Sequence, residues 1–139
     1  MLIKLKYSYY LTLFKLMINY IYILDLTIMN NKIQIGSTKF PYSKLNSYQT
    51  NFPFNVNYLK LYKITSDDYD CYQVENLIKQ SFVDIITNNG FADNNNFNNE
   101  IIENFFINNK INFQLVNIED CSKDESFDEY KKELLIKNN

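Results

Sequence analysis

The sequence predicts a single α+β domain, in which helices flank a small three-stranded antiparallel sheet. Three segments rich in Ile, Leu and Tyr have the composition of strands, and they span residues 20–26, 32–35 and 56–64. Two further segments, near 41–50 and 68–87, carry apolar residues at helical spacing. With 139 residues and 46% apolar content, the chain can bury one core, and it shows no internal repeat.

The domain is predicted to begin with two strands joined by a turn. Residues 20–26 form an apolar run of Ile, Leu and Tyr, which is typical of a buried strand. The Asn pair at 30–31 is a turn signal. In the second strand Ile33 and Ile35 share one face, because side chains alternate along a strand. We expect Gly36 to end this strand.

The first helix and the third strand follow. Pro41 suits the first turn of a helix, where its missing N–H has no intrahelical partner to lose. Leu45 lies one turn into this helix. In the strand at 56–64, alternation places Leu59 and Leu61 on one face and the Tyr and Lys residues around them on the other.

A second helix is predicted from the Ser-Asp-Asp sequence at 66–68, because carboxylates favour the positive N-terminal end of a helix. Its apolar stripe consists of Cys71, Val74, Ile78, Phe82 and Ile85. We expect Gly90, after two Asn residues, to be the left-handed residue that ends it.

The rest of the chain has weaker signals. Residues 91–99 are rich in Asn and are expected to form a loop. A short helix face and one further strand follow, carried by Ile101, Ile102, Phe105 and Phe106 and then by Ile111, Phe113 and Leu115. Ser122 and Glu125 have the spacing of a capping box, which would open an acidic C-terminal helix.

The N-terminal 19 residues have a basic start and an apolar middle, which are features of a signal peptide or a membrane anchor. Lys15 and Asn19 interrupt the apolar run, and no small-residue cleavage site follows. We therefore favour an extension packed on the core, or a start at Met17, over a small secreted or membrane-tethered protein. The resulting division is an extension (1–19), a domain (20–108) and a C-terminal strand and acidic helix (109–139).

Composition excludes several kinds of chemistry. The chain has no His, so a His metal ligand, a His base and a Ser-His-Asp triad are all excluded. Cys71 and Cys121 lack the spacing of a zinc site, and we expect reduced thiols in an intracellular compartment. The abundance of Asn, Ile, Lys and Tyr suggests an AT-rich genome.

Charge is unevenly distributed along the chain. Residues 1–63 hold eight Lys and one Asp, a net charge of +7, whereas residues 64–139 hold six Lys and fifteen carboxylates, a net charge of −9. The basic half would suit a phosphate backbone. The alternative is that folding mixes the two halves on one surface and cancels the field.

Several short motifs occur in an order that resembles the GIY-YIG endonuclease superfamily, most of all its branch from phages and large DNA viruses. The resemblance covers roughly residues 20–106. It is carried by Tyr20-Ile21-Tyr22, Gln34-Ile35-Gly36, Thr38, Leu45, Tyr48, Gln49-Thr50, Pro53-Phe54 and the segment Val74–Phe82. The family has Tyr where this chain has Gln34 and Arg where it has Lys44, and its usual His positions carry Tyr48 and Lys79.

The resemblance implies a site made of Tyr22, Gln34, Lys44 and Glu75. In this scheme Glu75 would hold Mg²⁺ or Mn²⁺, Tyr22 would orient or deprotonate the attacking water, and Lys44 would lie beside the phosphate. The implied function is metal-dependent hydrolysis of phosphodiester bonds in DNA. The departures from the family motifs leave open whether this activity is retained, weakened or lost. The implied partner is DNA, with no small-molecule cofactor and no membrane.

Other interpretations of the same residues stay open. A non-catalytic module on the same fold could bind nucleic acid or another protein. Glu75 and Lys79 are four residues apart with Glu first, which is also the spacing of a surface ion pair on a helix. Because Glu75 follows the apolar Val74, we expect its side chain at the edge of the buried face.

Overall fold

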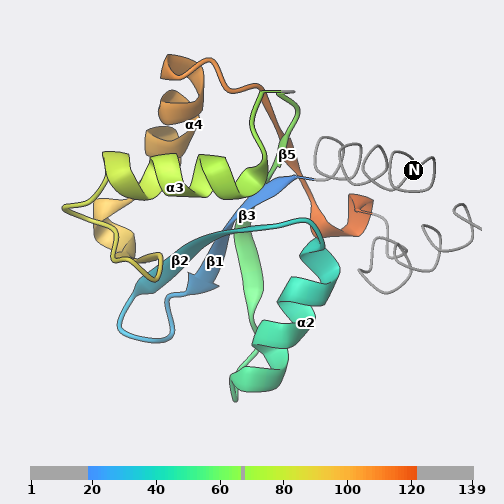
Figure 1. The fold of residues 1–139 in the computed structure, drawn as a ribbon. Coiled ribbons are helices and arrows are strands. Elements are labelled where there is room, and N and C mark those ends of the chain that lie inside the picture. The colour runs from blue at the N-terminus through green and yellow to red at the C-terminus, as the bar shows by residue number, and fades with distance from the viewer. Residues whose placement is uncertain (1–18, 67, 122–139) are drawn as a thin grey trace, which may run out of the picture.

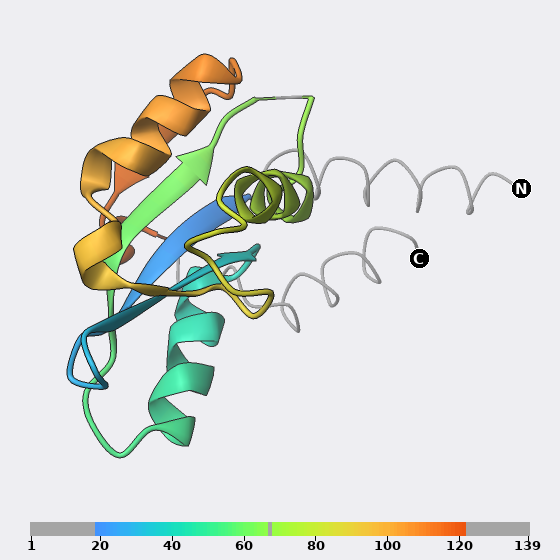
Figure 2. The ribbon, with the colours of Figure 1, turned by 90° about the vertical axis from the view of Figure 1, so that its left-hand side faces the viewer.

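The computed structural model describes residues 19–66 and 68–121. It contains a five-stranded antiparallel sheet with helices on both faces (Figures 1 and 2). In chain order the strands are β1 (Tyr20–Leu26), β2 (Lys32–Thr38), β3 (Asn57–Ile64), β4 (Phe91–Asp93) and β5 (Phe113–Val116). The helices are α2 (Pro41–Asn51), α3 (Cys71–Ser81) and α4 (Asn99–Asn108), with 3₁₀ turns at Asn94–Asn96 and Ile118–Asp120. The predicted α+β class is confirmed.

The strand order is β4-β2-β1-β3-β5, so the three predicted strands form the centre of the sheet. β1 lies in the middle and is buried on both of its faces. Its Ile21 and Ile23 face a core shared with α3 and α4, whereas Tyr20, Tyr22 and Leu24 face a core shared with α2. We call these the α3/α4 face and the α2 face.

The prediction of three strands was wrong, because the sheet has two further strands at its edges. β4 lies in the segment expected to be a loop, where three residues pair with residues 32–34 of β2. Three residues carry too little pattern to be recognised without their partner strand. The possible strand after residue 109 is confirmed as β5, which pairs with β3.

β2 does not end at Gly36, as we had expected, but continues to Thr38. Gly36 pairs with Tyr22 of β1 in the middle of the ladder. A glycine inside a strand often marks a close approach by another group. Here that group is the Tyr22 ring, because a Cβ at Gly36 would overlap the end of that side chain.

A β-bulge explains why the alternation predicted for β3 was wrong. Lys60 and Tyr58 pair with consecutive residues of β1, so Leu59 between them has no partner in the ladder. Tyr58 and Leu61 therefore both pack on the α2 face, and Leu59 is 42% exposed. The prediction assumed that side chains alternate without interruption along the strand. The single extra residue of the bulge changes which face the residues on either side of it occupy.

α3 is shorter than predicted, and it begins later. Its N-cap is Asp70, whose side chain accepts the Gln73 N–H at 2.9 Å while the Gln73 side chain accepts the Asp70 N–H at 2.9 Å. The predicted start at Ser66 was wrong, because the Ser66 hydroxyl instead accepts the backbone N–H of Asn112 at 2.6 Å. The predicted N-terminal extension up to residue 18 and the acidic C-terminal helix lie outside the described residues.

Gly90 has the predicted left-handed conformation, with φ of 87°. It does not end α3, which stops at Ser81, but lies in a separate turn before β4. Its carbonyl accepts the Ile35 N–H at 2.8 Å, and a Cβ here would overlap the Ile35 carbonyl oxygen. β4 begins directly after this turn and pairs only with residues 32–34, so it covers only the first part of β2.

Candidate functional site

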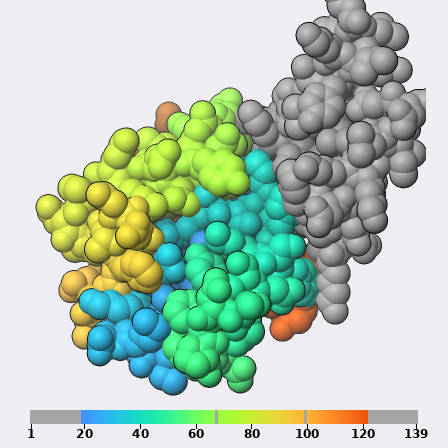
Figure 3. Space-filling model, turned by 60° about the horizontal axis from the view of Figure 1, so that its bottom comes forward, coloured from blue at the N-terminus to red at the C-terminus, as the bar shows by residue number. Residues whose placement is uncertain are grey.

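The site is built around the part of β2 that β4 does not cover. Beyond residue 34, the ladder with β4 ends, and within the described part of the chain residues 35–38 form the outer edge of the sheet. The Ile35 N–H points outward to Gly90, and because backbone direction alternates, the Ser37 N–H points outward as well. In Figure 3 this edge is recessed between α3 (lime) and α2 (teal to green). We call this recess the cleft.

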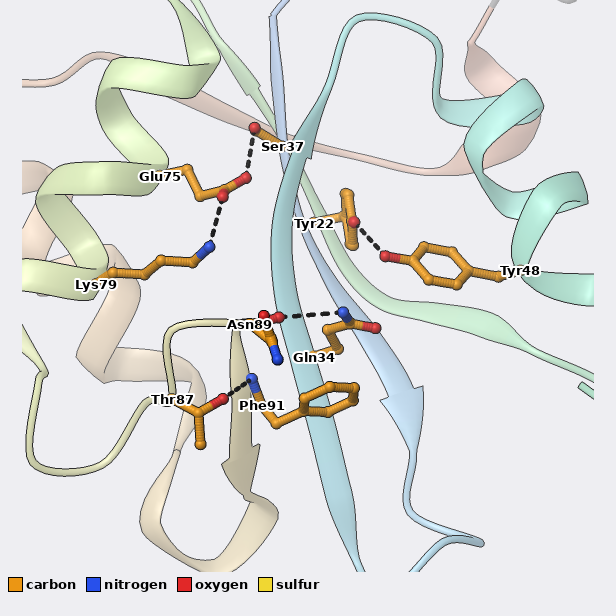
Figure 4. Close-up of polar contacts among 9 residues, drawn as sticks. All are labelled: Tyr22, Gln34, Ser37, Tyr48, Glu75, Lys79, Thr87, Asn89 and Phe91. Carbon is orange, nitrogen blue, oxygen red and sulfur yellow. Dashed lines mark hydrogen bonds and ion pairs between the residues drawn. The ribbon is translucent and has the colours of Figure 1, made fainter. Parts of the chain in front are cut away.

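Two tyrosines from different elements meet on the α2 side of the cleft. Tyr22 extends from β1 across Gly36, and its hydroxyl oxygen lies 2.6 Å from that of Tyr48 on α2 (Figure 4). The two rings are 5.9 Å apart in an edge-on arrangement. The glycine at 36 is therefore what allows the hydroxyl pair to form above β2.

Burial raises the pKa of Tyr22, and its hydrogen bond to Tyr48 and the charge of Glu75 act in the same direction. Burial also raises the pKa of Tyr48, and the Glu75 charge adds to that effect. Both hydroxyls therefore stay protonated at neutral pH.

Lys44 places a positive charge beside the ring of Tyr48. It lies on α2 one turn before Tyr48, and its Nζ atom is 5.4 Å from the centre of the Tyr48 ring. An ammonium at this distance from an aromatic face is attracted to the ring quadrupole. The contact keeps the Lys44 charge near the rim of the cleft.

Glu75 lies on α3, on the other side of β2 (Figure 4). Its Oε1 accepts the Ser37 hydroxyl at 2.5 Å, and its Oε2 lies 2.7 Å from the Lys79 ammonium. The Glu75 side chain is 20% exposed and the Lys79 side chain is 23% exposed. The predicted placement of Glu75 at the edge of the buried face and the predicted helical ion pair are both observed.

Gln34 lies farther along β2, towards β4. Its Nε2 donates to the backbone carbonyl of Asn89 at 3.2 Å, in the turn before Gly90 (Figure 4). This bond fastens the turn to β2. The structure thus brings Tyr22 and Lys44 together through Tyr48 and places Glu75 on the other side of β2, whereas the described contacts of Gln34 tie it to the turn.

Sequence reasoning missed Ser37, the residue that orients the Glu75 carboxylate. The available signal was the alternation along β2, which places residue 37 on the same face as Ile33 and Ile35. That face is the one that α3 covers. Because we expected the strand to end at Gly36, the alternation was not carried one step further.

A second missed feature is a buried polar cluster at the start of α3. The Lys39 ammonium donates to the Asn19 side-chain oxygen at 2.8 Å, and the same oxygen accepts the Cys71 N–H at 3.0 Å. The Lys39 Nζ atom also lies 5.6 Å from the centre of the Tyr72 ring. These contacts join the chain before β1, the end of β2 and the first turn of α3.

The implied metal was tested against these residues. In the described part of the chain, no group of three or more His, Cys, Asp or Glu side chains is arranged to hold a metal ion. Mg²⁺ can bind through one carboxylate and several waters. However, both oxygens of Glu75 are engaged, one of them by the ammonium of Lys79. In this arrangement the residues do not fit a divalent cation at Glu75.

The fold and the cleft define a small α+β domain in which a carboxylate and a tyrosine pair flank an open sheet edge. The family model of the T5orf172 domain matches residues 19–123, so the chain belongs to the T5orf172 domain family. This family is associated with GIY-YIG-like, endonuclease-type domains, which supports the predicted resemblance at the level of a nuclease-like domain.

No curated protein and no solved structure matches the chain. Among the residues that the structure describes, no helix is both long and apolar enough to cross a membrane.

Proposed function

We propose that this protein is a nuclease-like domain that binds DNA, and that it holds the phosphate backbone in the cleft without a divalent metal. The observation that carries the proposal is the ion pair of Lys79 with Glu75, which keeps an ammonium beside the open edge of β2. Family membership supports a nuclease-like or DNA-binding role.

The cleft offers donors that suit phosphate oxygens. Lys44 and Lys79 carry positive charge on opposite sides of β2, and lysine binds phosphate as a compact point charge. The protonated hydroxyls of Tyr22 and Tyr48 add uncharged donors. The outward N–H of Ser37 adds a backbone donor of the kind that commonly contacts phosphates.

The same residues are poorly suited to hydrolysis. The raised pKa of Tyr22 opposes its use as a base at neutral pH, so it would orient a group rather than take a proton. Gln34 cannot take a proton, and Lys44 lacks the planar fork with which Arg grips a transition-state phosphate. The negative charge of Glu75 is matched by Lys79. These properties favour binding over cleavage.

DNA binding can be tested by fluorescence anisotropy with a labelled duplex, in EDTA, over a range of salt concentrations. We expect Lys44→Gln and Lys79→Gln each to weaken binding and to lower the slope of log K against log salt by about 1, because each removes one phosphate contact. The matched control is Lys60→Gln on β3, which lies across β1 from β2. Failure to bind at low salt, or an equal effect of Lys60→Gln, would contradict the proposal.

Metal-dependent cleavage is the second candidate. It is favoured by the placement of the Glu75 carboxylate on one side of β2 and of the Tyr22–Tyr48 hydroxyl pair on the other (Figure 4). It requires Lys79 to leave Glu75 when DNA enters. A plasmid-nicking assay with Mg²⁺ or Mn²⁺ compares the wild type with Glu75→Gln. Nicking by the wild type alone would establish cleavage, and no nicking by either protein would support the binding domain.

A further inference from the structure

We propose that the Lys79 ammonium is a built-in substitute for a divalent cation at Glu75, and that removal of its charge opens a Mg²⁺ or Mn²⁺ site in the cleft. The inference deepens the proposed function, on which its biological meaning rests. The geometry itself does not depend on DNA being the ligand.

The carboxylate of Glu75 is held in a fixed orientation. The Ser37 hydroxyl binds Oε1 from β2, and the Lys79 ammonium lies 2.7 Å from Oε2 on the same helix. About a fifth of each charged side chain is exposed, so the pair is screened less than a fully solvated one. One oxygen therefore faces a neutral donor from the sheet, and the other faces a cation.

The ammonium fills the position that a metal would need. Mg²⁺ requires carboxylate oxygen ligands at about 2.0–2.1 Å and a nearly octahedral shell that is mostly water. A second cation at the same oxygen would be repelled by the Lys79 ammonium, which already lies 2.7 Å from it. The ammonium has three donors, and only one is used on Glu75, so the others can bind a phosphate oxygen.

Loss of the ammonium would leave a carboxylate suited to a metal. Oε2 of Glu75 would lose its partner, while Ser37 would still orient the group through Oε1. The space of the lysine head group would be open to water. A hard divalent cation with one protein carboxylate and a mostly aqueous shell matches this arrangement.

The test measures Mn²⁺ binding to the full chain without DNA, by electron paramagnetic resonance of free Mn²⁺ and by the melting temperature. The variants are Lys79→Met, which keeps much of the aliphatic stem, and Lys79→Ala. We expect both to bind one Mn²⁺ at least about tenfold more tightly than the wild type, and to gain melting temperature with Mn²⁺.

Three controls make the result specific. Lys79→Arg keeps a cation at Glu75 and should show no gain. Lys60→Met removes a lysine charge elsewhere and should show none either. The double variant Glu75→Gln/Lys79→Met should lose the gain that Lys79→Met alone shows. Circular dichroism establishes that each variant is folded.

Two results would overturn the inference. One is wild-type Mn²⁺ binding as tight as that of Lys79→Met. The other is a folded Lys79→Met and Lys79→Ala pair that gains no Mn²⁺ affinity. Because the assay contains no DNA, a protein that gains Mn²⁺ on loss of Lys79 but does not bind DNA would refute the proposed function alone.

Discussion

At the scale of single residues, Gly36 and Tyr22 behave as one unit. The two residues are opposite one another in the β1–β2 ladder, and the ring of Tyr22 occupies the space above the glycine. That position brings the Tyr22 hydroxyl to Tyr48. The identity of residue 36 thus decides where a hydroxyl 14 positions earlier in the chain is found.

We predict that Gly36→Ala destabilises the protein, although alanine is ordinarily better than glycine inside a strand. The new Cβ would overlap the end of the Tyr22 side chain and push the ring away from Tyr48. Overpacking of this kind costs about 1–3 kcal/mol in free energy of unfolding. Urea denaturation of the two proteins measures the difference.

The cause can be isolated by repeating the substitution in a Tyr22→Leu background. Leucine lacks the atoms that meet residue 36, so Gly36→Ala should cost much less there, and the double-mutant cycle gives the coupling energy. An equal cost in both backgrounds would show that the clash with the ring is not the reason.

Some residue contacts could be predicted from the sequence and others could not. The Glu75–Lys79 pair follows from helical spacing alone, because both residues lie on one helix face. Ser37 is 38 positions before Glu75, and their contact depends on how α3 crosses β2. The sequence around either residue contains no pattern that predicts how the helix crosses the strand. The contact of Ser37 with Glu75 is therefore seen only in the structure.

At the scale of elements, the start of α3 sets the position of Glu75. The helix begins when Asp70 and Gln73 satisfy each other's backbone N–H groups. From that cap, Glu75 and Lys79 fall on the side that faces the cleft. The sequence contains several Asp residues at this point, and only the cap geometry distinguishes the one that acts.

We predict that Asp70→Ala lowers the free energy of unfolding by about 1 kcal/mol, the usual cost of removing an N-cap side chain. Asp68→Ala is the matched control, because Asp68 is exposed and is not the cap. Thermal or urea unfolding measures both variants. Equal effects of the two substitutions would contradict the assigned cap.

The elements that the sequence predicted are those with enough length to carry a period. β1, β2 and β3 have seven or eight residues each, and their apolar composition was sufficient to identify them. β4 has three residues and exists because Ile33 and its neighbours offer it partners. The bulge at Leu59 also escaped prediction, because only pairing reveals an unpaired residue.

At the scale of the whole molecule, buried tyrosines link stability to alkaline pH. Burial raises the pKa of Tyr22, Tyr58 and Tyr62 well above the usual value for tyrosine, and Tyr22 and Tyr62 are each at most 3% exposed. Above the pKa of the unfolded chain, about 10, the unfolded state loses these protons while the folded state keeps them. Stability is therefore fully present below pH 10 and falls as pH rises beyond it.

We predict that the free energy of unfolding decreases above about pH 10 by about 1.4 kcal/mol per pH unit for each such tyrosine. Urea denaturation at a series of pH values between 8 and 11 measures the slope. Tyr62→Phe removes one of these three groups and should make the slope shallower. Among the described residues, the Tyr62 hydroxyl has no hydrogen-bond partner, so this substitution breaks no such bond.

A flat profile up to pH 11, or the same slope in Tyr62→Phe, would contradict this link. The result matters for the cleft as well, because Tyr22 is one of the three tyrosines. Tyr22 is buried in the core of the α2 face, and this burial raises the pKa of its hydroxyl, which therefore keeps its proton.

Gly90 lies outside the cleft, yet it determines how long the cleft is along β2. The chain enters β4 from this left-handed turn, whose Gly90 carbonyl accepts the Ile35 N–H, so β4 begins at residue 91 and makes only three pairs with β2. Each additional pair would extend β4 by about 3.4 Å along β2 and would soon cover Gly36 and Ser37. The position of the turn before β4 thus sets the length of the cleft. Insertions or deletions in that turn would lengthen or shorten the cleft without changing any residue that lines it.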